Sequence, residues 1–236
     1  MATPPLRRWR RSPKLITIMS TNDPLLSGLL AQRLLPLWYH ECANTSVAVL
    51  EGLYAGGIRY VEYTNRGPAA PANFKALRAT ADGLDGLQLG IGTIKNDDQA
   101  RQYLDLGADF LIAPSVNTGV GALAAAAGKP WIPGCMTPTE IADAENAGAQ
   151  VVKIFPGNVL GPAFISAVRD LFPGLRFLVT GGVEAETANL EGWFRAGASG
   201  VGMGSKLLSK ELMDNPDRDR IRDAAAQALA LVQQIR

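Results

Sequence analysis

The sequence has few of the residues from which metal sites and histidine-based catalytic centres are built. Its 236 residues include one histidine, His40, and two cysteines, Cys42 and Cys135. Zinc sites need clustered ligands, and the two cysteines stand far apart without a metal-ligand spacing. A metal-dependent enzyme site is therefore poorly supplied with ligands, and a histidine-based triad would have to use His40.

Strong charge and long apolar runs are also missing. Lys and Arg number 23 and Asp and Glu number 22, so the net charge is +1 and gives no electrostatic case for a nucleic-acid or anionic-membrane partner. No apolar run approaches the roughly 18 residues that suggest a membrane span. With two unpaired thiols expected, a reducing cytoplasm is the expected compartment.

The N-terminus stands apart from the rest of the chain. A basic cluster, Arg7–Arg11, is followed by Pro13. A twin-arginine export signal would need a longer apolar run than Leu15–Met19. We expect residues 1–20 to be a disordered extension. The alternative is a start codon assigned too early, with Met19 as the true first residue. Residues 21–236, of ordinary apolar content, are then expected to form one domain.

One local pattern recurs along the chain: a helix-like segment, a glycine, then an apolar strand. It occurs at Ala55–Ile58, Leu106–Asp109, Ala147–Gln150 and Ala196–Ser199. Glycine after a helix takes the left-handed conformation without steric cost, so the pattern is typical of repeated βα units. The predicted strands are Leu34–Tyr39, Ile58–Tyr63, Gln88–Ile91, Phe110–Ala113, Trp131–Ile132, Val151–Phe155, Phe177–Val179 and Gly200–Gly202.

The predicted helices alternate with these strands. They are Asp23–Leu34, Ser46–Ala55, Ala69–Asp82, Asp97–Leu106, Gly119–Ala127, Pro138–Ala147, Pro162–Leu171, Ala185–Ala196 and Arg218–Ile235. Eight βα units in this length predict an α/β fold, a single (β/α)8 TIM barrel with an extra N-terminal helix. A doubly wound open sheet is the alternative, but Tyr39–Cys42 is not the glycine-rich loop that it would need.

Lys153 lies in the apolar run Val151–Pro156, which reads as a strand buried on both faces. Burial disfavours the ammonium, and a free amine attacks carbonyls to form a Schiff base. The alternative is a strand-end lysine whose head reaches water. Other residues must decide between the two.

Glu62 interrupts the second apolar strand in the same way. The second and sixth strands of an eight-stranded barrel face each other, and alternate strands fill the same interior layer. Glu62 and Lys153 can therefore meet inside the barrel. A purely structural buried ion pair is the alternative interpretation.

Further polar residues follow the strand ends, where active sites of such barrels lie. Arg66 has the planar fork that binds a carboxylate, or is a surface arginine; Thr93 could bind the same anion, or cap the next helix. The loops add Pro114-Ser115 and Pro133-Gly134, and His40 is expected at the barrel mouth. Backbone N–H groups for an anion are supplied by Thr180, Gly181 and Gly182 after the seventh strand and by Gly204 and Ser205 after the eighth, unless these glycines mark only tight turns.

Taken together and in order, these segments resemble a known family, the bacterial 2-keto-3-deoxy-6-phosphogluconate (KDPG) and 2-keto-4-hydroxyglutarate (KHG) aldolases. The resemblance runs from about Leu34 to Leu208. It rests on Ala55–Arg66, Gly90–Thr93, Ile132–Gly134, Val152–Pro156 and Thr180–Val183.

The resemblance implies a class I aldolase, a carbon–carbon lyase that forms pyruvate without a metal or organic cofactor. It implies that Lys153 is the Schiff-base lysine and Glu62 the proton shuttle. Arg66 and Thr93 would hold the pyruvate carboxylate, and Pro114 is a further expected substrate-binding residue. Thr180, Gly181, Gly182, Gly204 and Ser205 would line the distal or phosphate end. A homotrimer acting on a small 2-keto-3-deoxy acid is also implied.

Several positions depart from that family. The first strand ends in Trp38-Tyr39-His40 where relatives carry a polar or basic residue, Gly157-Asn158 replaces alanine, and Lys206 follows Ser205 where relatives often have an aromatic residue. These departures leave open the aldehyde, its phosphorylation and its stereochemistry. Two other functions also stay open: a phosphate-binding transferase similar to thiamine-phosphate synthase, and a non-catalytic sugar-acid binder.

Overall fold

The computed structural model describes residues 23–235, so the expected extension at residues 1–20 lies outside the described residues. The strands are β1 (Leu34–Trp38), β2 (Tyr60–Thr64), β3 (Gln88–Gly92), β4 (Leu111–Ile112), β5 (Trp131–Ile132), β6 (Gly134–Cys135), β7 (Val151–Ile154), β8 (Arg176–Thr180) and β9 (Gly200–Met203). The helices are α1 (Pro24–Gln32), α2 (Ala43–Ala55), α3 (Ala70–Ala81), α4 (Asp97–Asp105), α5 (Thr118–Ala126), α6 (Pro138–Asn146), α7 (Gly157–Val168), the 3₁₀ helix η1 (Arg169–Leu171), α8 (Thr187–Ala196), α9 (Lys210–Asp214) and α10 (Arg218–Gln234). No helix within residues 23–235 is long and apolar enough to cross a membrane.

The strands form one parallel sheet in the order β5-β4-β3-β2-β1-β9-β8-β7-β6. Its two outermost strands, β5 and β6, are separated only by Pro133, whose carbonyl accepts a hydrogen bond of 2.7 Å from the Lys153 N–H. Because proline has no N–H to donate, it interrupts the strand there. The predicted fifth strand is thus two short strands at one barrel position, and the predicted TIM barrel is confirmed.

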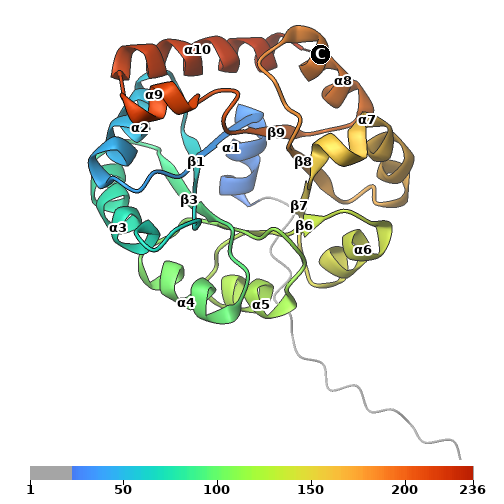
Figure 1. Cartoon of the computed structure of the whole chain (residues 1–236). Helices are drawn as coiled ribbons and strands as arrows, with labels where there is room; N and C mark the ends of the chain where they lie inside the picture. Colours follow the sequence, from blue (N-terminus) through green and yellow to red (C-terminus); the bar gives the residue numbers. More distant parts are fainter. Residues whose placement is uncertain (1–22, 236) are drawn as a thin grey trace, which may run out of the picture.

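Helices surround the barrel, as Figure 1 shows in a view along its axis. A glycine with a left-handed backbone follows the end of a helix at four places, as the sequence pattern predicts. The backbone angle φ is positive at Gly57, Gly107, Gly148 and Gly197. The predicted start of α6 is also confirmed, because Thr137 and Glu140 form a reciprocal capping box around Pro138.

Two helical segments differ from the prediction. The helix α7 begins at Gly157 and not at Pro162, because a first turn precedes a break at Gly161 (φ 70°) and Pro162 then starts the second part. The helix α9 was not predicted. Its five residues are too few to show a helical period, although Ser209 caps it and Leu212 and Met213 are buried.

The helix α1 covers the end of the barrel where the strands begin. Its Leu26 and Leu29 pack against interior residues that include Leu35, Ile112 and Leu178. The buried Gln32 side chain joins this helix to the strands, accepting from the Tyr60 N–H at 3.0 Å and donating to the Tyr60 carbonyl at 2.8 Å. The helix α1 does not cover the other end of the barrel, where the strands finish and where a functional site can lie.

Candidate active site

Lys153 and Glu62 meet inside the barrel, as the strand positions predict. Lys153 is on β7 and Glu62 on β2, and Lys153 Nζ lies 3.8 Å from Glu62 Oε1. Their side chains are 8% and 1% exposed. A separation of 3.8 Å allows an ion pair but exceeds ordinary hydrogen-bond length, so both groups keep capacity for a third partner.

Glu62 is a buried carboxylate with neither oxygen hydrogen-bonded within the described residues. The space it occupies exists because β3 presents glycine beside it: a Cβ on Gly92 would overlap the Glu62 carboxylate. A buried carboxylate without hydrogen bonds costs free energy, which its ion pair with Lys153 offsets only in part. Both Glu62 oxygens can therefore still accept a hydrogen bond.

Phe155 connects the lysine to the cavity at the strand C-terminal ends. Lys153 Nζ lies 5.0 Å from the centroid of the Phe155 ring, within the range of a cation–π contact. Phe155 lines a cavity of about 330 Å³, a volume suited to a small metabolite. The other residues that line it are Leu37, Trp38, Tyr39, Arg66, Thr180, Gly181, Gly182, Val183, Gly202, Gly204, Ser205, Lys206, Leu208 and Met213.

Most predicted substrate-binding residues are therefore gathered at one cavity. The Arg66 guanidinium is exposed at its rim and makes no ion pair or hydrogen bond within residues 23–235. Thr93 and Pro114 are half-buried and are not among the lining residues.

Thr93 follows Gly92 directly and has a left-handed backbone (φ 64°), which is uncommon and strained for a β-branched residue. Asn96, and not Thr93, caps α4.

The distal part of the cavity is made by the ends of β8 and β9. Thr180 is 8% exposed and its hydroxyl has no hydrogen-bond partner in the described structure. Gly181 and Gly182 both have positive φ, at 97° and 72°. A Cβ on Gly157 would lie 2.5 Å from the Gly181 carbonyl oxygen, so the start of α7 has room only for glycine beside this turn.

Trp38 and Tyr39, at the end of β1, also line the cavity. Each has a buried polar atom, Trp38 Nε1 and Tyr39 Oη, without a hydrogen-bond partner in the described residues. Burial, with smaller contributions from Tyr63 and Glu41, raises the pKa of the Tyr39 hydroxyl, so this group stays a neutral donor.

His40 lies in the loop after β1, as expected, but does not line the cavity. Its carbonyl accepts hydrogen bonds from Ser46, Tyr63 and Asn73, and its Nδ1 accepts from the Cys42 N–H at 3.0 Å. His40 therefore fixes the loop at the barrel mouth.

Sequence reasoning did not identify Asn189, Trp193 or Glu184 as parts of the site. Asn189 Nδ2 and Trp193 Nε1 donate to the Gly182 carbonyl, at 3.0 and 3.4 Å, and the Glu184 N–H donates to Asn189 Oδ1 at 3.0 Å. No motif marks these contacts, because they join a loop to the helix that follows it. An asparagine in the first turn of that helix was the one available signal.

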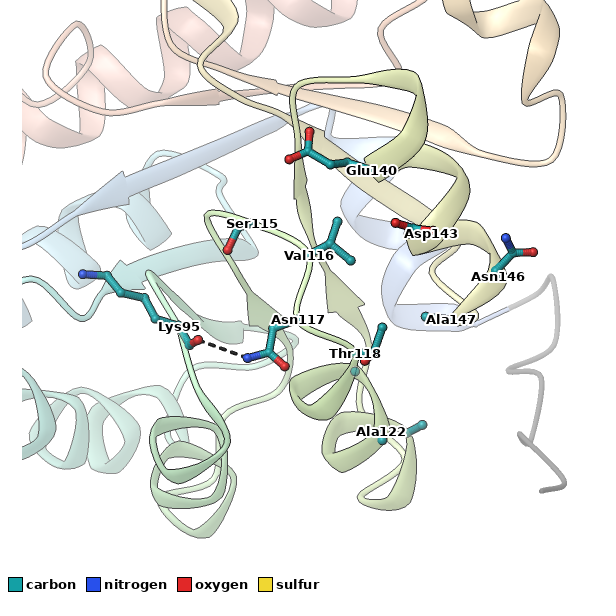
Figure 2. Close-up of a pocket in the computed structure, with 12 residues that line it drawn as sticks. Lys95, Ser115, Val116, Asn117, Thr118, Ala122, Glu140, Asp143, Asn146 and Ala147 are labelled. Atoms are coloured by element: carbon teal, nitrogen blue, oxygen red, sulfur yellow. Dashed lines mark hydrogen bonds between the residues drawn. The ribbon is translucent and has the colours of Figure 1, made fainter. Parts of the chain in front are cut away.

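A larger cavity, of about 870 Å³, lies between α5 and α6 on the outside of the barrel (Figure 2). Of the residues considered above, only Ser115 and the capping Glu140 line it. It holds no buried amine–carboxylate pair, so chemistry and not size decides which cavity is the candidate active site. Within residues 23–235, no group of three or more His, Cys, Asp or Glu side chains is placed to hold a metal ion.

Comparison with known proteins agrees with this geometry. The family model for KDPG and KHG aldolase matches residues 27–224. The chain belongs to the KDPG and KHG aldolase family. The match favours the aldolase interpretation over the transferase alternative.

Individual members of the family are moderately similar to this chain. A 2-dehydro-3-deoxy-6-phosphogalactonate aldolase of Escherichia coli is 36% identical over 124 residues, 52% of this chain and 60% of that relative's length. The crystal structure of a 4-hydroxy-2-oxoglutarate/2-dehydro-3-deoxyphosphogluconate aldolase from TTHB1 has a TM-score of 0.75 at 33% identity, covering 89% of this chain and 98% of its own. A KDPG aldolase from Legionella pneumophila, with pyruvate captured as a covalent carbinolamine, has a TM-score of 0.77 at 25% identity and covers 84% of this chain and 95% of its own.

Proposed function

We propose that the protein is a class I aldolase that reversibly cleaves a 2-keto-4-hydroxy acid to pyruvate and an aldehyde. The observation that carries the proposal is the buried Lys153–Glu62 pair, 3.8 Å apart. Neither residue lines the cavity at the strand ends, but Lys153 Nζ lies 5.0 Å from the centroid of the Phe155 ring, and Phe155 lines it. The carbinolamine of the Legionella pneumophila relative supports a lysine that attacks pyruvate. KDPG and KHG are the two substrates that the family suggests, giving glyceraldehyde 3-phosphate or glyoxylate.

The first half of the reaction forms a covalent imine. The Lys153 amine adds to the C2 ketone, and the carbinolamine loses water to give the protonated imine. Glu62 supplies a proton to the departing hydroxyl and becomes the carboxylate. The imine nitrogen, now cationic, can accept the electron pair of the bond that breaks next.

The second half breaks the C3–C4 bond. Glu62, directly or through a water, takes the proton of the C4 hydroxyl as the aldehyde carbonyl forms, and the bonding electrons pass into the enamine. The enamine is then protonated at C3, and water hydrolyses the imine to release pyruvate and restore the lysine. The electrons balance within the imine, so the reaction as written needs no metal or organic cofactor.

The remaining site residues bind the substrate in this proposal. Arg66, with an unpaired guanidinium at the cavity rim, suits the pyruvate carboxylate. Thr93 and Pro114, which do not line the cavity, are the further substrate-binding residues of the proposal. The Thr180 hydroxyl and the turns at Gly181-Gly182 and Gly204-Ser205 face the distal part of the substrate. Backbone N–H groups in such turns suit a phosphate.

The deciding assay measures pyruvate release, coupled to NADH oxidation by lactate dehydrogenase, with KDPG and with KHG. We expect turnover of at least one substrate. A non-catalytic sugar-acid binder would instead give a calorimetric binding signal with no pyruvate. Binding without turnover of either substrate would refute the aldolase proposal.

We also propose a homotrimer in the cytoplasm. The family resemblance supports the trimer. The absence of a disulfide between the free thiols of Cys42, exposed, and Cys135, buried, fits a reducing compartment.

A further inference from the structure

A charged bridge links the two loops that form the distal part of the cavity. Glu184 is in the loop after β8 and Lys206 in the loop after β9, and Lys206 Nζ lies 2.6 Å from Glu184 Oε1. Lys206 lines the cavity together with Gly181, Gly182 and Ser205, whereas Glu184 does not. The carboxylate therefore contacts the lysine without itself lining the cavity.

The loop that carries Glu184 is fixed to α8. Asn189 holds it at two points, because it donates to the Gly182 carbonyl and accepts from the Glu184 N–H, both at 3.0 Å. Trp193 adds a second donor to the Gly182 carbonyl at 3.4 Å. These contacts keep Glu184 close to the glycine turn, so its charge acts at a fixed place beside the distal cavity.

The bridge affects the charge that a substrate meets there. Lys206 and Arg66 are the two cationic side chains among the lining residues, and the bridge offsets one of them. Its members are 60% and 36% exposed, so the pair is weak and a competing anion can break it. The hydrogen bond to Glu184 raises the pKa of Lys206, so the lysine stays an ammonium available to such an anion.

We propose that Glu184 is a specificity-determining residue that competes with the substrate's distal phosphate for Lys206. The proposal rests on the proposed aldolase function. A phosphorylated substrate must take Lys206 from Glu184 and approach a second negative charge, whereas a substrate without phosphate leaves the bridge intact. The chain therefore accepts both phosphorylated and unphosphorylated 2-keto-3-deoxy acids with weak preference, and Glu184 is the residue that keeps the preference weak.

The test compares Glu184→Gln, Lys206→Ala and the double variant with wild type. Glu191→Gln is the matched control, since Glu191 makes an equally short bridge of 2.6 Å to Arg195 on the exposed side of α8 and is 35% exposed. For each protein, kcat and KM are measured with KDPG and with its unphosphorylated counterpart, 2-keto-3-deoxygluconate (KDG), because KHG itself ends in an anionic carboxylate. The dissociation constant of inorganic phosphate is measured separately by calorimetry, which does not depend on turnover.

We expect Glu184→Gln to lower the KM for KDPG and the dissociation constant of phosphate by about fivefold, as removal of one nearby surface charge allows. The KM for KDG should stay within about twofold of wild type in Glu184→Gln, as should all constants of Glu191→Gln. Lys206→Ala should weaken phosphate binding. When Glu184→Gln is added to Lys206→Ala, the KM for KDPG and the dissociation constant of phosphate should change by less than about twofold, because the competition acts through Lys206.

Three outcomes would overturn the proposal. They are an unchanged ratio of the KM values for KDPG and KDG in Glu184→Gln, an equal effect of Glu184→Gln with and without Lys206, and no measurable phosphate binding by any variant. Wild-type protein that binds phosphate but cleaves neither substrate refutes the aldolase function instead, and its phosphate constants still decide the role of Glu184.

Discussion

At the residue scale, Glu62 is unusual because it is buried and neither of its carboxylate oxygens has a hydrogen bond in the described structure. If it moves protons, Glu62→Gln, which keeps the shape and removes the base, should lower kcat by about a hundredfold or more. The measurement is the steady-state pyruvate assay. Glu41→Gln, an exposed change at the barrel mouth, is the control. Near-normal turnover of Glu62→Gln would mean that Glu62 is only the structural partner of Lys153.

The two cysteines should differ in reactivity. Cys42 is exposed at the start of α2, and the Thr45 backbone N–H, followed by the Thr45 side chain and the Asn44 N–H, lowers the pKa of its thiol. Burial, followed by Glu140 and Asp143, raises the pKa of Cys135 to about 12.

We therefore expect Ellman's reagent at neutral pH to react with one thiol per native chain and with two after denaturation. A lowered pKa gives Cys42 more thiolate at a given pH. The rate of its reaction with Ellman's reagent should therefore reach its plateau at a lower pH than the rate for an unperturbed thiol does. Cys42→Ser should remove the native reaction. Native labelling that peptide mass maps to Cys135 would contradict this assignment.

Sequence reasoning predicted that Lys153 and Glu62 lie close together inside the barrel. Each charged residue interrupts a buried strand, and barrel geometry places those two strands opposite each other. It did not predict the left-handed backbone of Thr93 or the bridge between Glu184 and Lys206. Both depend on how loops close, and a loop's path is set by distant contacts such as those of Asn189 and not by local periodicity.

At the element scale, α1 closes the barrel at the end away from the site. Leu29, 2% exposed, packs into the barrel interior. Leu29→Ala should lower the free energy of unfolding in urea by about 2–5 kcal/mol, because it leaves a cavity in that core. Ser27→Ala, exposed on the same helix, should change it by less than about 0.5 kcal/mol. Equal small losses in both variants would show that α1 is dispensable for stability.

Element positions were predictable where the hydrophobic pattern is long, and less so where it is short. The helix-glycine-strand repeats predicted the βα units because each helix must end in a conformation that favours glycine. The division of the fifth strand follows from Pro133, whose missing N–H interrupts the strand, while α9 has too few residues to show a period.

At the scale of the whole molecule, the proposed trimer predicts a specific mass. One chain is 25.1 kDa, so three chains give about 75 kDa in light scattering at micromolar concentration. A mass of one chain at that concentration would contradict the trimer without affecting the lysine chemistry.

The central claim is that Lys153 forms a Schiff base with pyruvate. Reduction with borohydride in the presence of pyruvate traps such an imine as a stable secondary amine. We expect one reduced pyruvyl group per chain, mapped by peptide mass to Lys153, and none in Lys153→Ala or in Lys153→Arg, whose guanidinium is not a nucleophile at this pH. Labelling of a different lysine, or no label on protein that releases pyruvate, would contradict the account.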